Sequence, residues 1–264
     1  MRLALLARLR HVRAVRAFAR RCARVVDAFE NANDYSFETN GEARVLHALA
    51  ARGAKRLFDV GAHVGDWASL ARRLVPQAEI HCFEIVPETF ALLERRLGRE
   101  PGFVLNGFGL GSEDGEATVR HYPDASALST TTAYPHGREW RELRARVRAG
   151  DSYLRERGLD LVDLVKIDAE GAEPRILDGF ASALERRSLH AVQFEYGQVS
   201  ILTRFLLRDF HELFEARGYR VGRLYPLGVE FRDYAFTQED FRGGNFLAVR
   251  ADRDDLVKAL RPPG

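Results

Sequence analysis

Acidic residues at the ends of three short apolar runs are the side chains of this sequence best placed to do chemistry. The runs end at Glu84, Asp168 and Glu195, and each has the composition of a buried strand. In a parallel sheet, the carboxyl ends of neighbouring strands meet at one edge, where open α/β sheets bind their ligands. Carboxylates at that edge can accept hydrogen bonds from ligand hydroxyls, balance an ammonium group or move a proton.

A glycine turn precedes the first of these acids. A strand predicted at 56–60 runs into Gly61-Ala62-His63-Val64-Gly65, and a helix and a second strand lead from there to Glu84. This order of elements is how a Rossmann-type sheet binds the adenosine part of a cofactor. A dinucleotide site has a bare glycine where His63 stands, so the turn favours an adenosine ligand without phosphates, such as S-adenosyl-L-methionine. The alternative is an ordinary βα turn followed by a solvated glutamate.

A second acidic motif follows the buried strand predicted at 161–167. This strand carries Lys166 and ends on Asp168, and Glu170-Gly171-Ala172-Glu173 continues into a predicted helix. The acids would suit a ligand ammonium or the hydroxyls of an acceptor, and Lys166 could balance their charge. The alternative is a helix N-terminus enriched in acids for its dipole. That alternative explains Glu173, but it does not explain a lysine inside an apolar strand.

Length and composition favour one catalytic domain. The 264 residues, 46% of them hydrophobic, can bury a full core. We place the domain at 35–250, with an insertion at about 112–150, between an N-terminal extension at 1–34 and a C-terminal tail at 251–264. The two cysteines are far apart, which argues against a disulfide framework or a Cys-rich zinc site and favours a cytoplasmic location. A net charge of +2 gives no reason to expect nucleic acid binding.

The N-terminal extension is strongly basic. It carries no acid before Asp27, and Leu, Ala and Val recur between its arginines at helical spacing, which predicts a basic amphipathic helix. The arginines are Arg2, Arg8, Arg10, Arg13, Arg16, Arg20, Arg21 and Arg24. They interrupt any apolar stretch long enough for a secretory signal or a membrane span. The helix could contact an anionic membrane surface or an acidic partner, although a solvated face packed on the domain or on a partner subunit is the simpler interpretation.

Two further regions complete the expected sheet. The insertion holds an antiparallel strand at 116–122 and a hydroxyl-rich loop at 126–132, and a later helix is expected at 203–217. The last two strands, at 219–225 and 245–249, are joined by an irregular aromatic segment without a helix. We therefore expect these two strands to form an antiparallel pair.

Together these motifs resemble the FkbM family of S-adenosylmethionine-dependent methyltransferases. The resemblance rests on 57–65, on Phe83-Glu84, on Leu110-Gly111-Ser112-Glu113-Asp114-Gly115 and above all on Lys166-Ile167-Asp168-Ala169-Glu170-Gly171-Ala172-Glu173, and it covers roughly 42–250. It implies O-methylation of hydroxyls on saccharides, glycolipids or polyketide-type natural products. His63 and Ile85 depart from the family pattern, which commonly has Asn and Pro at these positions.

The resemblance also implies an α/β fold, the Rossmann-like class I methyltransferase fold. This fold implies a mostly parallel sheet in the order 3-2-1-4-5-7-6, with the last strand antiparallel and helices on both faces, and the sequence offers the seven principal strands that it needs. Strands one, four and five are neighbours in this order. Asp59, Lys166, Asp168 and Glu195 should therefore lie close together, with Lys166 as the countercharge.

Carried over to this sequence, the family pattern implies three sets of site residues. The cofactor would contact Asp59, Gly61, Ala62, His63, Gly65, Glu84, Ile85, Gly111, Ser112 and Asp168, with Glu84 on the ribose diol. A small-molecule or glycan hydroxyl acceptor would contact Glu170, Glu173, Glu195, Ser129 and His136. The catalytic set is Asp168, His63, Glu195 and Lys166, and the general base is one of His63, His136, Asp168 and Glu195. No metal-ligand spacing is distinctive, so we predict no metal site.

Two other classes of function stay open. A nucleotide-cofactor oxidoreductase is disfavoured by His63 in the glycine turn. A non-catalytic binding module would keep the fold and use the basic helix for a membrane or an acidic partner. The sequence gives no indication of the oligomeric state.

Overall fold

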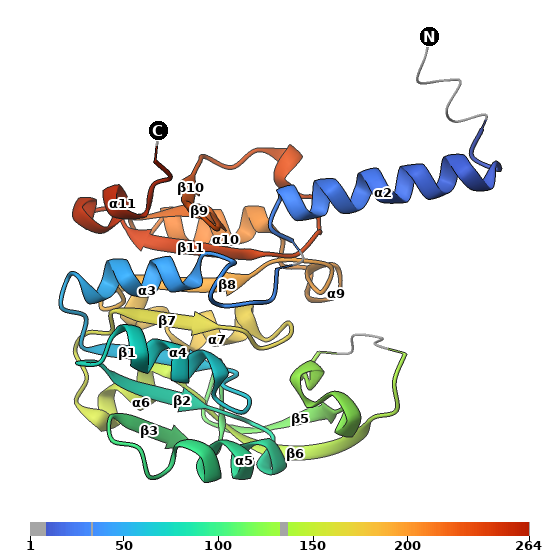
Figure 1. Cartoon of the computed structure of the whole chain (residues 1–264). Coiled ribbons are helices and arrows are strands. Elements are labelled where there is room, and N and C mark those ends of the chain that lie inside the picture. Colours follow the sequence, from blue (N-terminus) through green and yellow to red (C-terminus); the bar gives the residue numbers. More distant parts are fainter. Residues whose placement is uncertain (1–8, 33, 133–136, 264) are drawn as a thin grey trace.

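The computed structural model describes residues 9–32, 34–132 and 137–263. A central sheet of eight strands runs through this part of the chain in the order β10-β9-β11-β8-β7-β1-β2-β3 (Figure 1). Its strands are β1 (Arg56–Val60), β2 (Glu79–Phe83), β3 (Phe103–Asn106), β7 (Leu164–Ile167), β8 (Ala191–Glu195), β9 (Tyr219–Tyr225), β10 (Gly228–Phe231) and β11 (Asn245–Arg250). The five from β3 to β8 pair in parallel, while β11 is antiparallel to both β8 and β9. The expected order 3-2-1-4-5-7-6 is therefore confirmed.

The strand count differs from the expected seven, because β10 adds an eighth strand at the edge of the sheet. It lies in the segment expected to be irregular. Tyr225 of β9 pairs with Gly228 of β10, so only Pro226 and Leu227 form the hairpin turn. Val229 is fully buried there, and this burial stabilises a strand that the surrounding aromatic and charged residues obscure in the sequence.

Helices cover both faces of the sheet, as expected. One face packs on α3 (Glu42–Ala50), α4 (Asp66–Leu74), α5 (Pro87–Leu97) and α11 (Asp254–Leu260), and the other on α6 (Gly150–Arg157), α7 (Glu173–Gly179), α8 (Ala181–Glu185) and α10 (Leu207–Glu215). Alternate residues of one strand serve the two cores: Leu57 of β1 faces the first set of helices, while Phe58 and Val60 face the second. This burial on both faces fixes the strand ends that carry the acids.

The helix expected at about 203–217 forms as α10, which is shorter than expected, and a separate one-turn helix, α9 (Ser200–Thr203), precedes it. Arg204 between them has a left-handed φ of 57°, which no α-helix continues. The Asp209 carboxylate then accepts a hydrogen bond from the backbone N–H of Leu206 at 2.7 Å and so fixes a new helix start.

A second, smaller sheet forms in the expected insertion. It contains β4 (Gly109–Gly111), which comes just before the insertion, β5 (Gly115–His121) and β6 (Arg141–Ala149), in the order β4-β6-β5. The 3₁₀ helix η1 (Pro123–Leu128) follows β5 along the chain. The antiparallel strand expected at 116–122 is confirmed as β5. In Figure 1 this sheet lies on the side toward which the parallel strands point. It is therefore positioned to wall the ligand-binding edge.

The two ends of the described chain behave differently. The helix α2 (Arg13–Phe29) projects from the body, while α11 packs on α3 and buries Leu256, Val257 and Leu260. The residues expected to form a C-terminal tail thus contribute to the core, and the division of the chain into domains stays a prediction. Within the described residues, no helix combines the length and apolar character needed to cross a membrane.

Candidate active site

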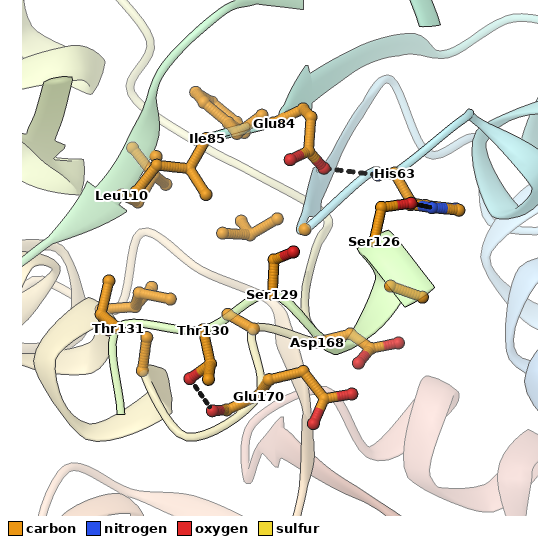
Figure 2. A pocket seen from close by; sticks show the side chains of 18 residues that line it. His63, Glu84, Ile85, Leu110, Ser126, Ser129, Thr130, Thr131, Asp168 and Glu170 are labelled. Carbon is orange, nitrogen blue, oxygen red and sulfur yellow. Dashed lines mark hydrogen bonds between the residues drawn. The ribbon is translucent and has the colours of Figure 1, made fainter. Parts of the chain in front are cut away.

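Two adjoining cavities open at the carboxyl edge of the parallel strands. The inner cavity, of about 70 Å³, lies between the glycine turn, Glu84, Leu110 and the hydroxyl-rich loop (Figure 2). The acidic cavity, of about 320 Å³, lies between α3, the ends of β1, β7 and β8, and the segment before α3. Gly61, His63, Ala127, Asp168 and Glu170 line both cavities, so one elongated ligand can contact both.

The glycine turn after β1 brings two strand ends into direct contact. Gly61 has φ 86°, and a Cβ added to it would lie 1.9 Å from the carbonyl oxygen of Asp168, so no other residue fits there. His63 also has a positive φ of 49°, a conformation in which His and Asn are both enriched. This backbone requirement explains how His63 can replace the Asn that is common in the family. Gly65 is the N-cap residue directly before α4 and, unlike Ala62, lines neither cavity.

Glu84 is held in place by the glycine turn and by its own following residues. Its carboxylate accepts hydrogen bonds from the backbone N–H groups of His63 at 2.9 Å and of Val86 at 2.8 Å. Only 6% of Glu84 is exposed. Burial raises its pKa, and the two backbone hydrogen bonds oppose that shift. A carboxylate has about four acceptor sites, so two stay available for a ligand diol in the inner cavity.

Of the other residues expected to contact the cofactor, some line the inner cavity and others lie outside it. Ile85 and Leu110 form an apolar wall of the inner cavity, as Figure 2 shows. Gly111 is buried in β4 and Ser112 is exposed, and neither lines a cavity. Of these three consecutive residues, Leu110 alone lines the inner cavity, and the cofactor contacts of Gly111 and Ser112 stay a prediction.

A buried lysine neutralises part of the acidic cavity. The Nζ atom of Lys166 lies 3.0 Å from Asp168 Oδ2 and 3.6 Å from Asp59 Oδ1. Burial would lower the pKa of Lys166, but the charges of Asp168 and Asp59 outweigh it and raise the pKa. Burial raises the pKa of Asp59 to about 6 despite Lys166, and neither of its carboxylate oxygens has a hydrogen-bond partner. The structure thus brings together the residues that strand adjacency predicts.

Three carboxylates crowd together beside this ion pair. Oxygen atoms of Asp168, Glu170 and Glu195 lie within 4.8 Å of one another. Burial, followed by the charge of Asp168, raises the pKa of Glu170 to about 8 and that of Glu195 well above its usual value. Such a cluster keeps protons or attracts a cation. The oxygen ligands also suit a divalent ion, and the expectation of no metal site stays a prediction from the sequence.

The other expected acceptor residues are placed differently. Glu173 lines neither cavity; its carboxylate accepts a hydrogen bond from the backbone N–H of Ala169 at 3.0 Å and so shapes the acidic loop. Burial raises the pKa of Glu173 to about 7. Ser129 lines the inner cavity rather than the acidic one, and His136 lies outside the described residues.

The hydroxyl-rich loop ties the two halves of the site together. His63 Nε2 lies 2.8 Å from Ser126 Oγ, and the Thr130 hydroxyl donates to the carbonyl oxygen of Glu170 at 2.5 Å (Figure 2). The Thr132 hydroxyl donates to the carbonyl oxygen of Gly171 at 3.1 Å. Burial lowers the pKa of His63, so its imidazole is neutral at neutral pH. The sequence singled out this loop by its composition but gave no contacts.

The segment before α3 is a wall of the acidic cavity that sequence reasoning missed. Asp34, Tyr35, Phe37, Asn40 and Glu42 line the cavity from this side. Glu42 is 1% exposed; its Oε1 accepts a hydrogen bond from Asn40 at 2.8 Å, while Oε2 has no partner. An acid in the first turn of the helix that precedes β1 was the available signal.

The sheet order, the reversed β11, the glycine turn after β1 and the acid after β2 define an α/β protein of the class I methyltransferase type. The family model described as "Methyltransferase FkbM domain" matches residues 59–221, which is more than half of the chain. This protein therefore belongs to the FkbM methyltransferase family.

Individual relatives are distant. The chain is 27% identical over 163 residues to the hexuronic acid methyltransferase AglP of Haloferax volcanii, covering 61% of this chain and 65% of AglP. It is 26% identical over 195 residues to the 31-O-demethyl-FK506 methyltransferase FkbM of Streptomyces tacrolimicus, covering 60% of this chain and 74% of that protein. The match thus spans less than two thirds of the length of AglP. A methyltransferase FkbM from Methylobacillus flagellatus aligns in structure with a TM-score of 0.47 and 15% identity, over 75% of this chain and 44% of that one.

Proposed function

We propose that this protein transfers a methyl group from S-adenosylmethionine to a hydroxyl oxygen of a saccharide, glycolipid or polyketide-type natural product. The observation that carries the proposal is the pair of adjoining cavities, one with the diol acceptor Glu84 and the other with an acidic wall, which meet at Gly61 and Asp168. Family membership supports methyl transfer. The cytoplasmic location and the absence of a nucleic acid partner stay predictions.

The inner cavity offers the groups that a nucleoside needs. Glu84 would bind the ribose diol, and Ile85 and Leu110 would contact the adenine. Bound there, S-adenosylmethionine supplies an activated methyl group on a cationic sulfur. The carboxylates of Asp59, Asp168 and Glu170 favour positive charge at the junction of the cavities, because Lys166 neutralises only part of theirs.

The acidic cavity then selects the acceptor. Lys166 is the one lysine or arginine among the described residues that line it, and its charge is already paired with Asp59 and Asp168. A free carboxylate or phosphate would be repelled, whereas a neutral or cationic polyhydroxyl compound would not. We therefore infer that the methylated group is an alcohol.

Alcohol methylation needs a proton acceptor near the reacting oxygen, and Glu195 is the residue that fits best. It lies at the end of β8, lines the acidic cavity, and has a pKa raised by burial and by the charge of Asp168. A carboxylate with a raised pKa is a stronger base once ionised. His63 is hydrogen-bonded to Ser126 and Asp168 is ion-paired with Lys166, so both act better by positioning.

Calorimetric binding of S-adenosylmethionine and S-adenosylhomocysteine tests the proposal. Glu84→Ala should weaken binding by roughly 1.5–3 kcal/mol, the range for a charge-assisted hydrogen bond. Glu94→Ala removes an exposed glutamate on α5, outside both cavities, and should leave binding unchanged. If the folded wild type binds neither compound, the chain is a non-catalytic binding module; retention of a nicotinamide cofactor would indicate an oxidoreductase.

A further inference from the structure

The helix α2 has two sharply different faces. Arg13, Arg16, Arg20 and Arg24 recur at spacings of three and four residues and share one side of the helix. The opposite side carries a continuous apolar stripe, formed by Val15, Phe18, Cys22, Val25, Val26 and Phe29. A stripe of this kind on a helix of a folded domain is normally covered.

Nothing in the described chain covers the stripe. Phe18, Val25 and Phe29 are 66%, 68% and 78% exposed, and α2 has no buried residue. Figure 1 shows the helix extending away from the sheet and its covering helices. Of the two simpler interpretations, packing on its own domain is therefore not what the structure shows, and packing on a partner subunit stays untested.

The helix is nevertheless firmly attached at its C-terminal end. Asp27 pairs with Arg242 at 2.5 Å, and the carboxylate of Glu30 accepts a hydrogen bond from the Tyr225 hydroxyl at 2.9 Å. Asn31 donates to the carbonyl oxygen of Leu224 at 3.1 Å. These contacts hold α2 to the body, so its exposed stripe has a defined position.

We propose that α2 docks on an anionic lipid surface, with its apolar stripe inserted at the headgroup boundary. The charge of the helix favours an anionic lipid surface, because residues 9–26 contain arginines and no acid. Two copies of α2 packed through their stripes would leave the arginines on the outer faces without a countercharge, whereas an anionic surface attracts them. A lipid surface accommodates the stripe and the arginines at once and requires no matching shape.

Docking would hold the acidic cavity close to the lipid surface. Asp34 in the cavity wall comes only five positions after Phe29 at the end of α2, and Tyr35 and Phe37 continue that wall. Docking of α2 on lipid would therefore suit an enzyme whose acceptor carries an apolar tail. This last step rests on the proposed function, while docking itself does not.

Co-sedimentation of the full chain with vesicles tests the docking directly. Vesicles of phosphatidylcholine alone are compared with vesicles that also contain phosphatidylglycerol, at low and at high salt. We expect partitioning onto the anionic vesicles to be about tenfold stronger and to fall with salt.

Three double variants separate the contributions. Phe18→Ser with Val25→Ser keeps the charge, Arg20→Gln with Arg24→Gln keeps the stripe, and each should lower partitioning about tenfold. Arg95→Gln with Arg99→Gln is the matched control, because these exposed arginines lie at the end of α5, which packs on the edge strand β3, and β10 and β9 are at the other edge of the sheet. This control variant should partition onto the vesicles as the wild type does. All these side chains are exposed, and a thermal melt confirms that each variant folds.

Two results would overturn the proposal. One is equal or absent binding to the two kinds of vesicle, which would leave a protein partner for the stripe. The other is lipid-free self-association that Phe18→Ser with Val25→Ser abolishes, which would assign the stripe to a second copy. Neither result depends on methyl transfer, so failure here is distinguishable from failure of the proposed function.

Discussion

Replacing Lys166 by methionine should destabilise the protein in a way that depends on pH. Lys166 is 2% exposed and is the countercharge of Asp59 and Asp168. Removing one partner of a buried ion pair typically costs about 3–5 kcal/mol, which for a chain of this size lowers the melting temperature by about 10 °C. Lys258→Met removes an exposed lysine of α11 and is the control.

The pH dependence follows from Asp59. Its pKa is already raised to about 6 from 3.8 by burial, with Lys166 opposing the shift. When folding raises the pKa of a carboxyl group, the protonated form stabilises the folded protein. This stabilisation is complete below the pKa of the group in the unfolded chain, and it is lost as the pH rises through the pKa of the group in the folded protein. Without Lys166 that pKa rises further, so the penalty should be small near pH 5 and largest above pH 7.

Urea unfolding of Lys166→Met and of Asp59→Asn with Lys166→Met, each at acidic and alkaline pH, measures the effect. The double variant should recover most of the lost stability at alkaline pH, because no ionised Asp59 is left without its countercharge. An equal loss at both pH values, or a double variant no more stable than the single one, would refute the role of Lys166 as countercharge.

Three further predictions concern the site. Gly61→Ala should abolish cofactor binding and lower stability by more than the roughly 1 kcal/mol expected for Gly53→Ala. Both glycines have a positive φ, but only the Cβ added at Gly61 meets a backbone oxygen. Equal melting temperatures of the two variants would contradict this. Between pH 6 and 8.5 the ligand-free protein should lose stability, because the raised pKa values of Glu173, about 7, and Glu170, about 8, favour the protonated folded state. Its affinity for S-adenosylmethionine should rise over the same range, because a bound cation favours the ionised carboxylates. Melting temperatures measured with and without the ligand check both signs. Glu195→Gln should lower kcat by about 10²–10⁴ with cofactor affinity little changed, and an unaltered kcat would exclude it as the base.

The main sheet was predictable because apolar runs and glycines mark its strands. The run at 191–195 is entirely buried apart from its last residue, and β8 has these bounds. The strand β6 was missed, since charged residues alternate with small and apolar ones and only part of it is buried. Its position depends on pairing with β5 and β4, which a local pattern does not record.

Part of the candidate site was likewise predictable from the sequence, and part of it was not. Adjacent strand ends determine that Asp59, Lys166 and Asp168 meet, so topology alone predicts their contact. The inward turn of Glu173 depends on the left-handed conformations of Glu170 and Gly171 in the acidic loop. Likewise, the wall at 34–42 reaches the cavity through contacts with distant parts of the chain, such as Gly41 against the backbone of Tyr225. Neither feature has a signature in neighbouring residues.

The hydroxyl-rich loop has a kinetic consequence. Its hydrogen bonds to His63, Glu170 and Gly171 close the inner cavity to about 70 Å³, whereas cavities that enclose small ligands measure about 300–1,000 Å³. If the inner cavity binds the nucleoside of S-adenosylmethionine as proposed, the loop has to release these contacts before the ligand enters. Association should then have two steps, and its rate should level off at high ligand concentration, at the frequency with which the loop opens.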